Sequence, residues 1–118
     1  MAGLETTGGS RHLALIEQIQ AMVEQYPMIL FMKGTPQWPM CGFSSRAVQA
    51  LQAAGADRLQ TVNILEDAEL RANLPRFSNW PTFPQLFIHG ELIGGSEIII
   101  ELLEAGELQR IVAEAGQA

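Results

Sequence analysis

The chain has 118 residues, of which 47% are apolar and 17% charged, and its formal net charge is -6 at pH 7. These values are typical of one globular domain with a continuous apolar core. They argue against nucleic-acid binding, because phosphate contacts need clustered Lys and Arg. No apolar run reaches the roughly 20 residues that span a bilayer. We therefore expect neither nucleic acid nor membrane among the partners.

The segment 1–10 is small, polar and Gly-rich, without the basic start and apolar stretch of a secretory signal. We expect a disordered tail over 1–10 and one folded domain over 11–118. A single cysteine excludes an internal disulfide, so the sequence is not that of a disulfide-bonded secreted scaffold. A cytoplasmic location is the default expectation, and an organellar form stays open.

The first half of the chain predicts helix, strand, loop and helix. Apolar residues recur at helical spacing over 15–26, and Pro27 ends that helix because proline has no backbone N–H to donate. The continuous apolar run 28–32 is typical of a strand buried on both faces. A loop rich in turn residues over 34–39 is followed by a helical stretch that closes at Gly55.

The second half predicts a strand–helix pair and a hairpin before the last helix. We expect the helix that follows the second strand to end before Pro75. A strand–helix–strand unit implies a parallel crossover, and a hairpin adds antiparallel strands to the same sheet. The fold class is therefore α/β, with a central four-stranded mixed sheet flanked by helices. The expected elements are a strand over 59–65, a helix over 67–74, strands over 85–88 and 91–93, and a helix over 98–112 broken at Gly106.

Cys41 is the candidate reactive residue. It lies where a loop meets the start of a helix, so unpaired amides and the helix dipole favour its thiolate form. Lys33, at the end of the preceding strand, adds a positive charge. An isolated cysteine is more often a buried small hydrophobe, but such a residue belongs on the apolar face of an element. The neighbouring Gly42 leaves a path to the sulfur.

Ser44 stands three residues after Cys41, where dithiol redox enzymes have a second cysteine. A hydroxyl can cap the helix or donate a hydrogen bond to the thiolate, but it cannot resolve a mixed disulfide. We infer that any redox cycle of this chain needs an outside thiol.

Four short motifs occur in a specific order: Lys33-Gly34-Thr35-Pro36, Cys41-Gly42-Phe43-Ser44, Trp80-Pro81-Thr82-Phe83-Pro84 and Gly94-Gly95. In this combination, over about 13–112, the chain resembles a monothiol glutaredoxin of the Cys-Gly-Phe-Ser type. The resemblance implies that 11–118 is a glutaredoxin domain with a thioredoxin-like fold, in which Pro84 follows a cis peptide bond.

The resemblance also implies a glutathione groove beside Cys41, the residue expected to carry both the redox chemistry and the metal contact. Lys33 and Arg71 would hold the glycine carboxylate of glutathione. The backbone of Phe83 would pair with its cysteinyl unit. The helix N-terminus at Gly95 and Ser96 would bind its γ-glutamyl carboxylate. The residues implied for glutathione binding are Lys33, Phe43, Arg71, Thr82, Phe83, Pro84, Gly95, Ser96 and Glu97.

Other interpretations of these residues stay open in the sequence. Arg71 could pair with Asp67 four residues earlier on the same helix, and Ser96 could serve only as a helix cap. Relatives commonly have Cys-Asp where this chain has Ser96-Glu97, and we expect the longer Glu97 to contact the ammonium group from a displaced position or through water. We expect Phe43 to shield the sulfur.

The function that the resemblance implies is carriage and transfer of a two-iron, two-sulfur cluster. Such a cluster needs four ligands, and the family supplies them in a homodimer from two cysteines and two glutathiones. BolA-like proteins and iron–sulfur recipient proteins are the suggested partners. The alternative is a glutathione-dependent thiol-disulfide oxidoreductase, in which Cys41 removes glutathione from protein mixed disulfides; under the first hypothesis this activity is weak at most. A pure interaction module is a third interpretation.

Overall fold

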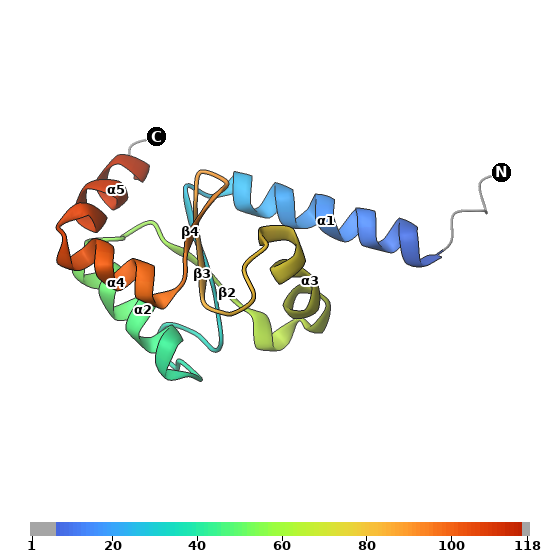
Figure 1. Cartoon of the computed structure of the whole chain (residues 1–118), viewed down its shortest axis with the longest axis horizontal. Coiled ribbons are helices and arrows are strands. Elements are labelled where there is room, and N and C mark those ends of the chain that lie inside the picture. Colours follow the sequence, from blue (N-terminus) through green and yellow to red (C-terminus); the bar gives the residue numbers. More distant parts are fainter. Residues whose placement is uncertain (1–6, 117–118) are drawn as a thin grey trace.

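The computed structural model describes the backbone of residues 7–116 and the side chains of residues 13–116 (Figure 1). Apart from a short 3-10 helix that was not predicted, the order and types of the elements agree with the sequence prediction. α1 includes residues 7–10, which we had assigned to the tail, and the rest of that tail lies outside the described residues. The elements are α1 (Thr7–Gln25), β1 (Met28–Met32), α2 (Gly42–Ala53), β2 (Gln60–Asn63), the 3-10 helix η2 (Ile64–Glu66), α3 (Ala68–Ser78), β3 (Gln85–Ile88), β4 (Glu91–Gly94), α4 (Ser96–Glu104) and α5 (Glu107–Ala115).

The strands form one four-stranded mixed sheet in the order β2-β1-β3-β4. β1 pairs parallel with β2 and antiparallel with β3, and β3 pairs antiparallel with β4. In Figure 1, α2, α4 and α5 lie on one side of this sheet, and α1 and α3 lie on the other. The predicted α/β fold class is confirmed.

Two apolar clusters, one on each face of the sheet, hold these layers together. Because successive side chains of a strand point to opposite faces, β1 contributes to both clusters. Leu30 packs with α2, α4 and α5, whereas Phe31 packs with α1 and α3. In the second cluster the ring of Phe87 lies 5.7 Å from that of Phe31, edge to face, and 6.2 Å from that of Phe77.

α3 continues through Pro75 to Ser78, so the prediction that it ends at Leu74 is wrong. A proline removes one helical hydrogen bond, but other contacts hold the last turn. The Ser78 hydroxyl donates to the Leu74 carbonyl at 3.1 Å, and the Trp80 backbone N–H donates to the Pro75 carbonyl at 3.2 Å. Phe77 also packs into the second cluster, so the extra turn buries apolar surface.

β2 is shorter than predicted, because Asn63 ends it and begins η2. The Asn63 Oδ1 accepts a hydrogen bond from the Leu65 N–H at 3.0 Å and another from the Gly34 N–H at 2.9 Å. The first bond caps η2. The second ties the segment that follows β1 to the neighbouring strand, and this segment leads to Cys41.

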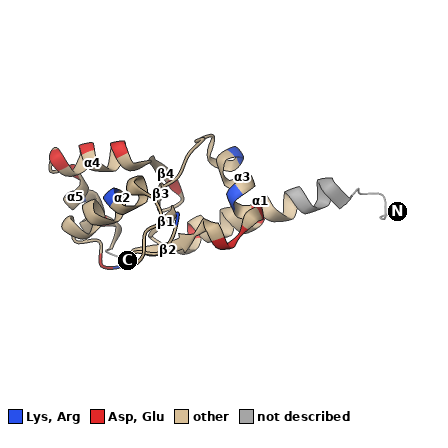
Figure 2. Ribbon diagram, turned by 90° about the horizontal axis from the view of Figure 1, so that it is seen from below, with Lys and Arg blue, Asp and Glu red and all other residues tan. Residues whose placement is uncertain are grey.

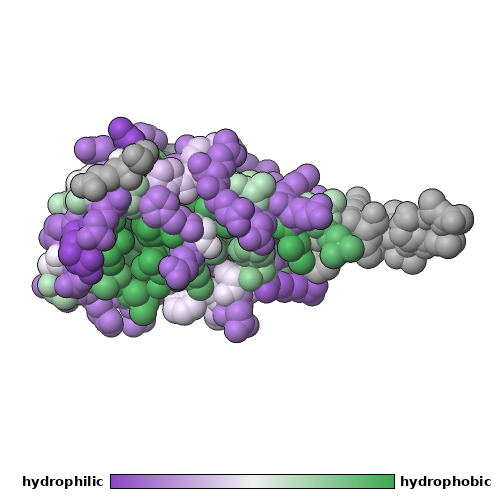
Figure 3. Space-filling view, turned by 90° about the horizontal axis from the view of Figure 1, so that it is seen from above, coloured by the Kyte–Doolittle hydropathy of each residue, from purple (hydrophilic) through white to green (hydrophobic). Residues whose placement is uncertain are grey.

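The surface is mostly polar, with apolar side chains reaching it in places. Figure 3 shows polar side chains over much of one face and apolar surface between them. Several residues around the first cluster, among them Ile100, Leu103 and Ile111, are only half-buried. Among the described residues, no helix is both long enough and apolar enough to cross a bilayer.

Replacing the buried ring at the centre of the second cluster should destabilise the fold. Phe87 is 2% exposed and contacts two other aromatic rings. Phe87→Ala should lower the free energy of unfolding by about 3–5 kcal/mol, because it removes apolar contacts and leaves a cavity. Urea titration followed by circular dichroism measures this change. Leu65→Ala, at a side chain that is 40% exposed, is the control; equal losses in the two variants would contradict the assignment of the core.

Candidate thiol and ligand-binding site

Cys41 is the N-cap residue of α2, with extended backbone angles of φ -158° and ψ 149°. The Ser44 backbone N–H donates a hydrogen bond to the Cys41 sulfur, with 3.5 Å between N and S. The thiol contacts the Ser44 Oγ at 3.7 Å. Cys41 is half-buried and forms no disulfide. The predicted position of the sulfur at the start of a helix is therefore correct.

Ser44 connects the sulfur to the end of β1. Its side chain is fully buried, and its Oγ accepts a hydrogen bond from the Lys33 N–H at 3.0 Å. A hydroxyl can accept and donate at the same time. When the thiol ionises, the Ser44 proton is therefore free to turn towards the sulfur.

The surroundings of Cys41 lower the pKa of its thiol below the usual value for cysteine. Partial burial by itself raises this pKa. The hydrogen bonds from the Ser44 backbone, the Ser44 side chain and the Phe43 backbone outweigh burial, and the positive charge of Lys33 acts in the same direction. The site thus holds a larger thiolate fraction at neutral pH than an isolated thiol, and thiolate is the nucleophilic and metal-binding form.

The loop between β1 and Cys41 folds back on itself. Gly34 has φ +92°, and a Cβ there would lie 2.7 Å from the Met40 nitrogen, so only glycine fits this turn. The Met40 N–H donates to the Lys33 carbonyl at 2.8 Å. This closure brings Cys41 back beside the end of β1. It leaves the side chains of Trp38 and Met40 exposed by 76% and 60%.

A cleft of about 560 Å³ lies beside Cys41. Every site residue predicted from the sequence lines it: Lys33, Cys41, Phe43, Arg71, Thr82, Phe83, Pro84, Gly95, Ser96 and Glu97. Pro75, Trp80 and Pro81 also line the cleft and were not predicted as site residues. The motif that contains Pro84 also contains Trp80 and Pro81, so it offered a signal for both. No sequence signal pointed to Pro75, which we placed beyond the end of a helix.

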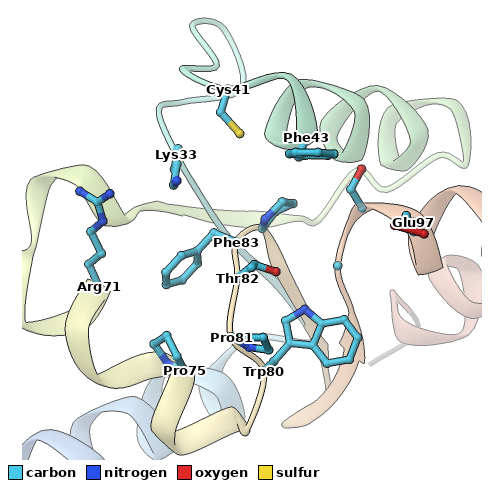
Figure 4. Close-up of a pocket in the computed structure, with 13 residues that line it drawn as sticks. Lys33, Cys41, Phe43, Arg71, Pro75, Trp80, Pro81, Thr82, Phe83 and Glu97 are labelled. Carbon is cyan, nitrogen blue, oxygen red and sulfur yellow. The ribbon is translucent and has the colours of Figure 1, made fainter.

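The two ends of the cleft carry opposite charges. In Figure 4 the Cys41 sulfur points into the cleft, Lys33 and Arg71 lie towards one end, and Glu97 lies towards the other. Figure 2 shows the same polarity along the elements, with basic residues on α3 and a row of acidic residues on α4. A ligand with a carboxylate at one end and an ammonium group at the other would match this arrangement.

Arg71 is available to the cleft rather than engaged on its own helix. Within the described residues Arg71 forms no ion pair. Asp67, its candidate partner, instead caps α3 by accepting a hydrogen bond from the Leu70 N–H at 3.0 Å. The alternative in which Arg71 pairs with Asp67 is therefore not what the structure shows.

The segment between α3 and β3 forms the floor of the cleft. The Phe83–Pro84 peptide bond is cis, as the resemblance implied. The fully buried amide of Gln85 donates to the Trp80 carbonyl at 2.9 Å and to the Thr82 carbonyl at 3.1 Å. One buried side chain thus fixes this loop against the sheet.

Gly95 allows α4 to approach this floor closely. A Cβ at position 95 would lie 3.2 Å from the Pro84 carbonyl oxygen and 3.2 Å from the Trp80 Nε1. Gly95 is also the N-cap of α4, and no side chain caps that end of the helix. Its first amides are therefore free to bind an anion in the cleft.

Phe43 lies at the other rim of the cleft, on the first turn of α2. Its side chain is 57% exposed, and the Arg46 guanidinium carbon lies 5.9 Å from the centre of its ring. Shielding of the sulfur by Phe43 stays a prediction. In the part of the chain that the structure describes, no three His, Cys, Asp or Glu residues are grouped to hold a metal ion.

Comparison with known proteins agrees with this geometry. The family model for glutaredoxin matches residues 28–93. The chain is 52% identical over 99 residues to Glutaredoxin 4 of Escherichia coli (strain K12), an alignment that covers 84% of this chain and 85% of that protein. The solution structure of reduced poplar apo GrxS14 is 44% identical, with a TM-score of 0.73, and the match covers 88% of this chain and 94% of that one.

A second solved structure, the crystal structure of a buckwheat glutaredoxin–glutathione complex, is 26% identical with a TM-score of 0.77. That match covers 91% of this chain and 94% of the buckwheat chain. With one cysteine, in the segment Cys41-Gly42-Phe43-Ser44, and a thioredoxin-like sheet, the chain belongs to the glutaredoxin family, as a monothiol member.

Proposed function

We propose that this chain binds glutathione in the cleft beside Cys41 and, as a homodimer, carries and transfers a two-iron, two-sulfur cluster. The observation that carries the proposal is the sulfur of Cys41, which points into a cleft with cations at one end and an acid and a helix N-terminus at the other. Glutathione presents a thiol between a carboxylate at one end and a carboxylate with an ammonium group at the other. The buckwheat relative forms a complex with glutathione.

The charges of the cleft set the direction of the bound tripeptide. Lys33 and Arg71 would hold the glycine carboxylate by charge-assisted hydrogen bonds. The free amides at the start of α4, with Ser96, would bind the γ-glutamyl carboxylate, and Glu97 would face the ammonium group. This direction places the glutathione sulfur near Cys41, between the two charged ends.

The floor of the cleft would bind the middle of the tripeptide. Phe83 lies outside the strands, and its backbone N–H and carbonyl form no backbone hydrogen bond with another described residue. These groups can pair with the cysteinyl unit of glutathione as in a two-stranded ladder. Thr82 and Pro84 flank that position and shape the floor.

The cluster is the cargo that this protein would carry, and one chain has too few ligands to hold it. A two-iron, two-sulfur cluster takes four ligands, commonly thiolates. One chain supplies Cys41, and one bound glutathione supplies a second thiolate beside it. Two such units supply four, which is why the proposal requires a homodimer.

This arrangement favours transfer over permanent storage. Half of the ligands belong to a dissociable small molecule, so the cluster can leave when glutathione leaves. The function also requires a compartment rich in reduced glutathione, for which the cytoplasm is our proposal. Iron–sulfur recipient proteins and a BolA-like protein are the partners we propose for this function.

The alternative function is glutathione-dependent removal of glutathione from protein mixed disulfides. The lowered pKa of Cys41 favours it, because the thiolate would attack the mixed disulfide. Free glutathione would then release the enzyme, since Ser44 cannot act as a resolving thiol. Both functions use the same cleft, and turnover distinguishes them.

The contribution of Ser44 to thiolate formation is testable by alkylation. Ser44→Ala should raise the pKa of Cys41, because the variant lacks the hydroxyl that contacts the sulfur. The rate of reaction with iodoacetamide at neutral pH should fall severalfold, and the midpoint of its pH profile should move to higher pH. Ser45→Ala is the matched control, since the Ser45 hydroxyl accepts from the Gln49 side chain instead. Superimposable profiles for the two variants would refute the role of Ser44.

Anaerobic reconstitution tests the proposed cargo directly. Protein mixed with iron, sulfide and glutathione should become coloured and dimeric, as measured by the visible spectrum and native mass spectrometry. Cys41→Ser should stay colourless and monomeric, because each half of the dimer would lose one of its two ligands. Omitting glutathione should have the same effect. A coloured Cys41→Ser dimer would mean that the ligand assignment is wrong.

Turnover of a glutathionylated peptide tests the alternative. We expect slow release of the peptide thiol, since the proposed carrier holds glutathione as a ligand rather than as an attacking thiol. Cys41→Ser, which has no nucleophile, sets the background rate. Fast turnover that depends on Cys41, in a protein that forms no coloured dimer, would instead favour the oxidoreductase.

A further inference from the structure

Trp80 stands in the cleft with an unused hydrogen-bond donor. The residue is half-buried and lines the cleft, and Figure 4 shows its indole nitrogen on the side of the ring that faces the cleft. Among the described residues, nothing accepts a hydrogen bond from this nitrogen. A tryptophan N–H that is partly removed from water usually has an acceptor, and a ligand in the cleft could supply one here.

The groups around this nitrogen are also donors without partners. Gly95 lies beside it, because a Cβ there would come within 3.2 Å of Nε1. The next residue, Ser96, is only 7% exposed, and its buried Oγ has no hydrogen-bond partner among the described residues. The amides of the first turn of α4 have no side-chain cap. Several groups that can donate without a partner in the protein thus lie at this end of the cleft, and a carboxylate would satisfy more than one of them at once.

We propose that the Trp80 indole N–H donates a hydrogen bond to the carboxylate of the γ-glutamyl residue of bound glutathione. Trp80 would then be a binding residue that selects for the γ-glutamyl end of the ligand, together with Ser96 and the start of α4. The inference rests on the proposed binding of glutathione in this cleft. It also gives a reason for glycine at position 95, since a Cβ there would crowd the indole and displace its N–H.

The backbone of Trp80 is held in place on both sides. Its N–H donates to the Ser78 Oγ and to the Pro75 carbonyl, each at 3.2 Å. Its carbonyl accepts from the buried Gln85 amide at 2.9 Å. The backbone that carries the indole is therefore fixed before any ligand enters, and a fixed donor loses little freedom on binding.

The competing explanation is that the Trp80 ring only packs against Gly95 and closes the floor of the cleft. Trp80→Phe separates the two explanations, because phenylalanine keeps an aromatic ring and removes the N–H. The probe is S-methylglutathione, which has both charged ends of glutathione and cannot form a disulfide with Cys41. Trp38→Phe is the matched control, since the Trp38 side chain is 76% exposed and does not line the cleft.

We expect Trp80→Phe to weaken the binding of S-methylglutathione about tenfold, as expected for one hydrogen bond to a charged group, and Trp38→Phe to leave the affinity unchanged. Titration monitored by NMR measures the dissociation constants. In the unchanged protein the indole N–H resonance of Trp80 should shift downfield on binding, whereas that of Trp38 should stay in place. This second measurement does not depend on the folding of a variant.

Two shorter probes locate the contact. S-methyl-γ-glutamylcysteine keeps the γ-glutamyl residue and should still distinguish the unchanged protein from Trp80→Phe. S-methylcysteinylglycine lacks it and should bind both equally. Equal affinity of the two proteins for S-methylglutathione, or an indole resonance of Trp80 that does not move at saturation, would overturn this inference and leave glutathione binding intact. No binding of S-methylglutathione to the unchanged protein would overturn both proposals.

Discussion

The site depends on one buried hydroxyl. Ser44 accepts from the Lys33 N–H and lies against the sulfur of Cys41 through both its backbone N–H and its side chain. The end of β1, the start of α2 and the thiol are therefore joined at a single residue. Because this hydroxyl stands where a dithiol enzyme has its second cysteine, the chain has exchanged a resolving group for a group that stabilises negative charge on the first sulfur.

The rest of the cleft comes from elements far apart in the sequence. β1 and α2 supply the cationic and sulfur side, α3 supplies Arg71, the loop before β3 supplies the floor, and α4 supplies the opposite end. The mixed sheet brings these segments together at the ends of its strands. Opposite charges at the two ends of the cleft and neutral backbone groups between them define a direction for a bound peptide. A peptide in this cleft would be recognised by the charges at its two ends, which would also fix the position of its thiol relative to Cys41.

The sequence was sufficient for the elements whose patterns are local. The continuous apolar run of β1 and the interruption at Gly106 both correspond to observed elements. The site residues followed from short motifs whose order matches a family. The error at the end of α3 has a physical cause. The proline rule ended α3 too early, because contacts made by Ser78 and Phe77 outweigh one lost hydrogen bond. Helical spacing could not rank two uses of the Asp67 carboxylate, pairing with Arg71 or capping the helix, and the structure shows the cap.

Trp80 lines the cleft and was not among the predicted site residues. From sequence alone, an aromatic residue in a Pro-rich segment can belong either to the core or to a binding surface. Its place in the cleft beside Gly95, which is 15 positions away in the chain, follows from the fold and not from the motif. Short motifs therefore could not predict the contacts between segments that are far apart in the chain.

Through Asn63, the loop beside the thiol depends on the edge strand β2. Its Oδ1 is the shared acceptor for the Gly34 and Leu65 amides, and it belongs to β2, the outermost strand on that side of the sheet. Strands at an edge open more readily than central ones. Fraying of this edge would free the Gly34 and Leu65 amides together, so the two would exchange hydrogen with solvent as one unit. The mobility of the loop that carries the thiol would then follow the opening of a strand that does not line the cleft.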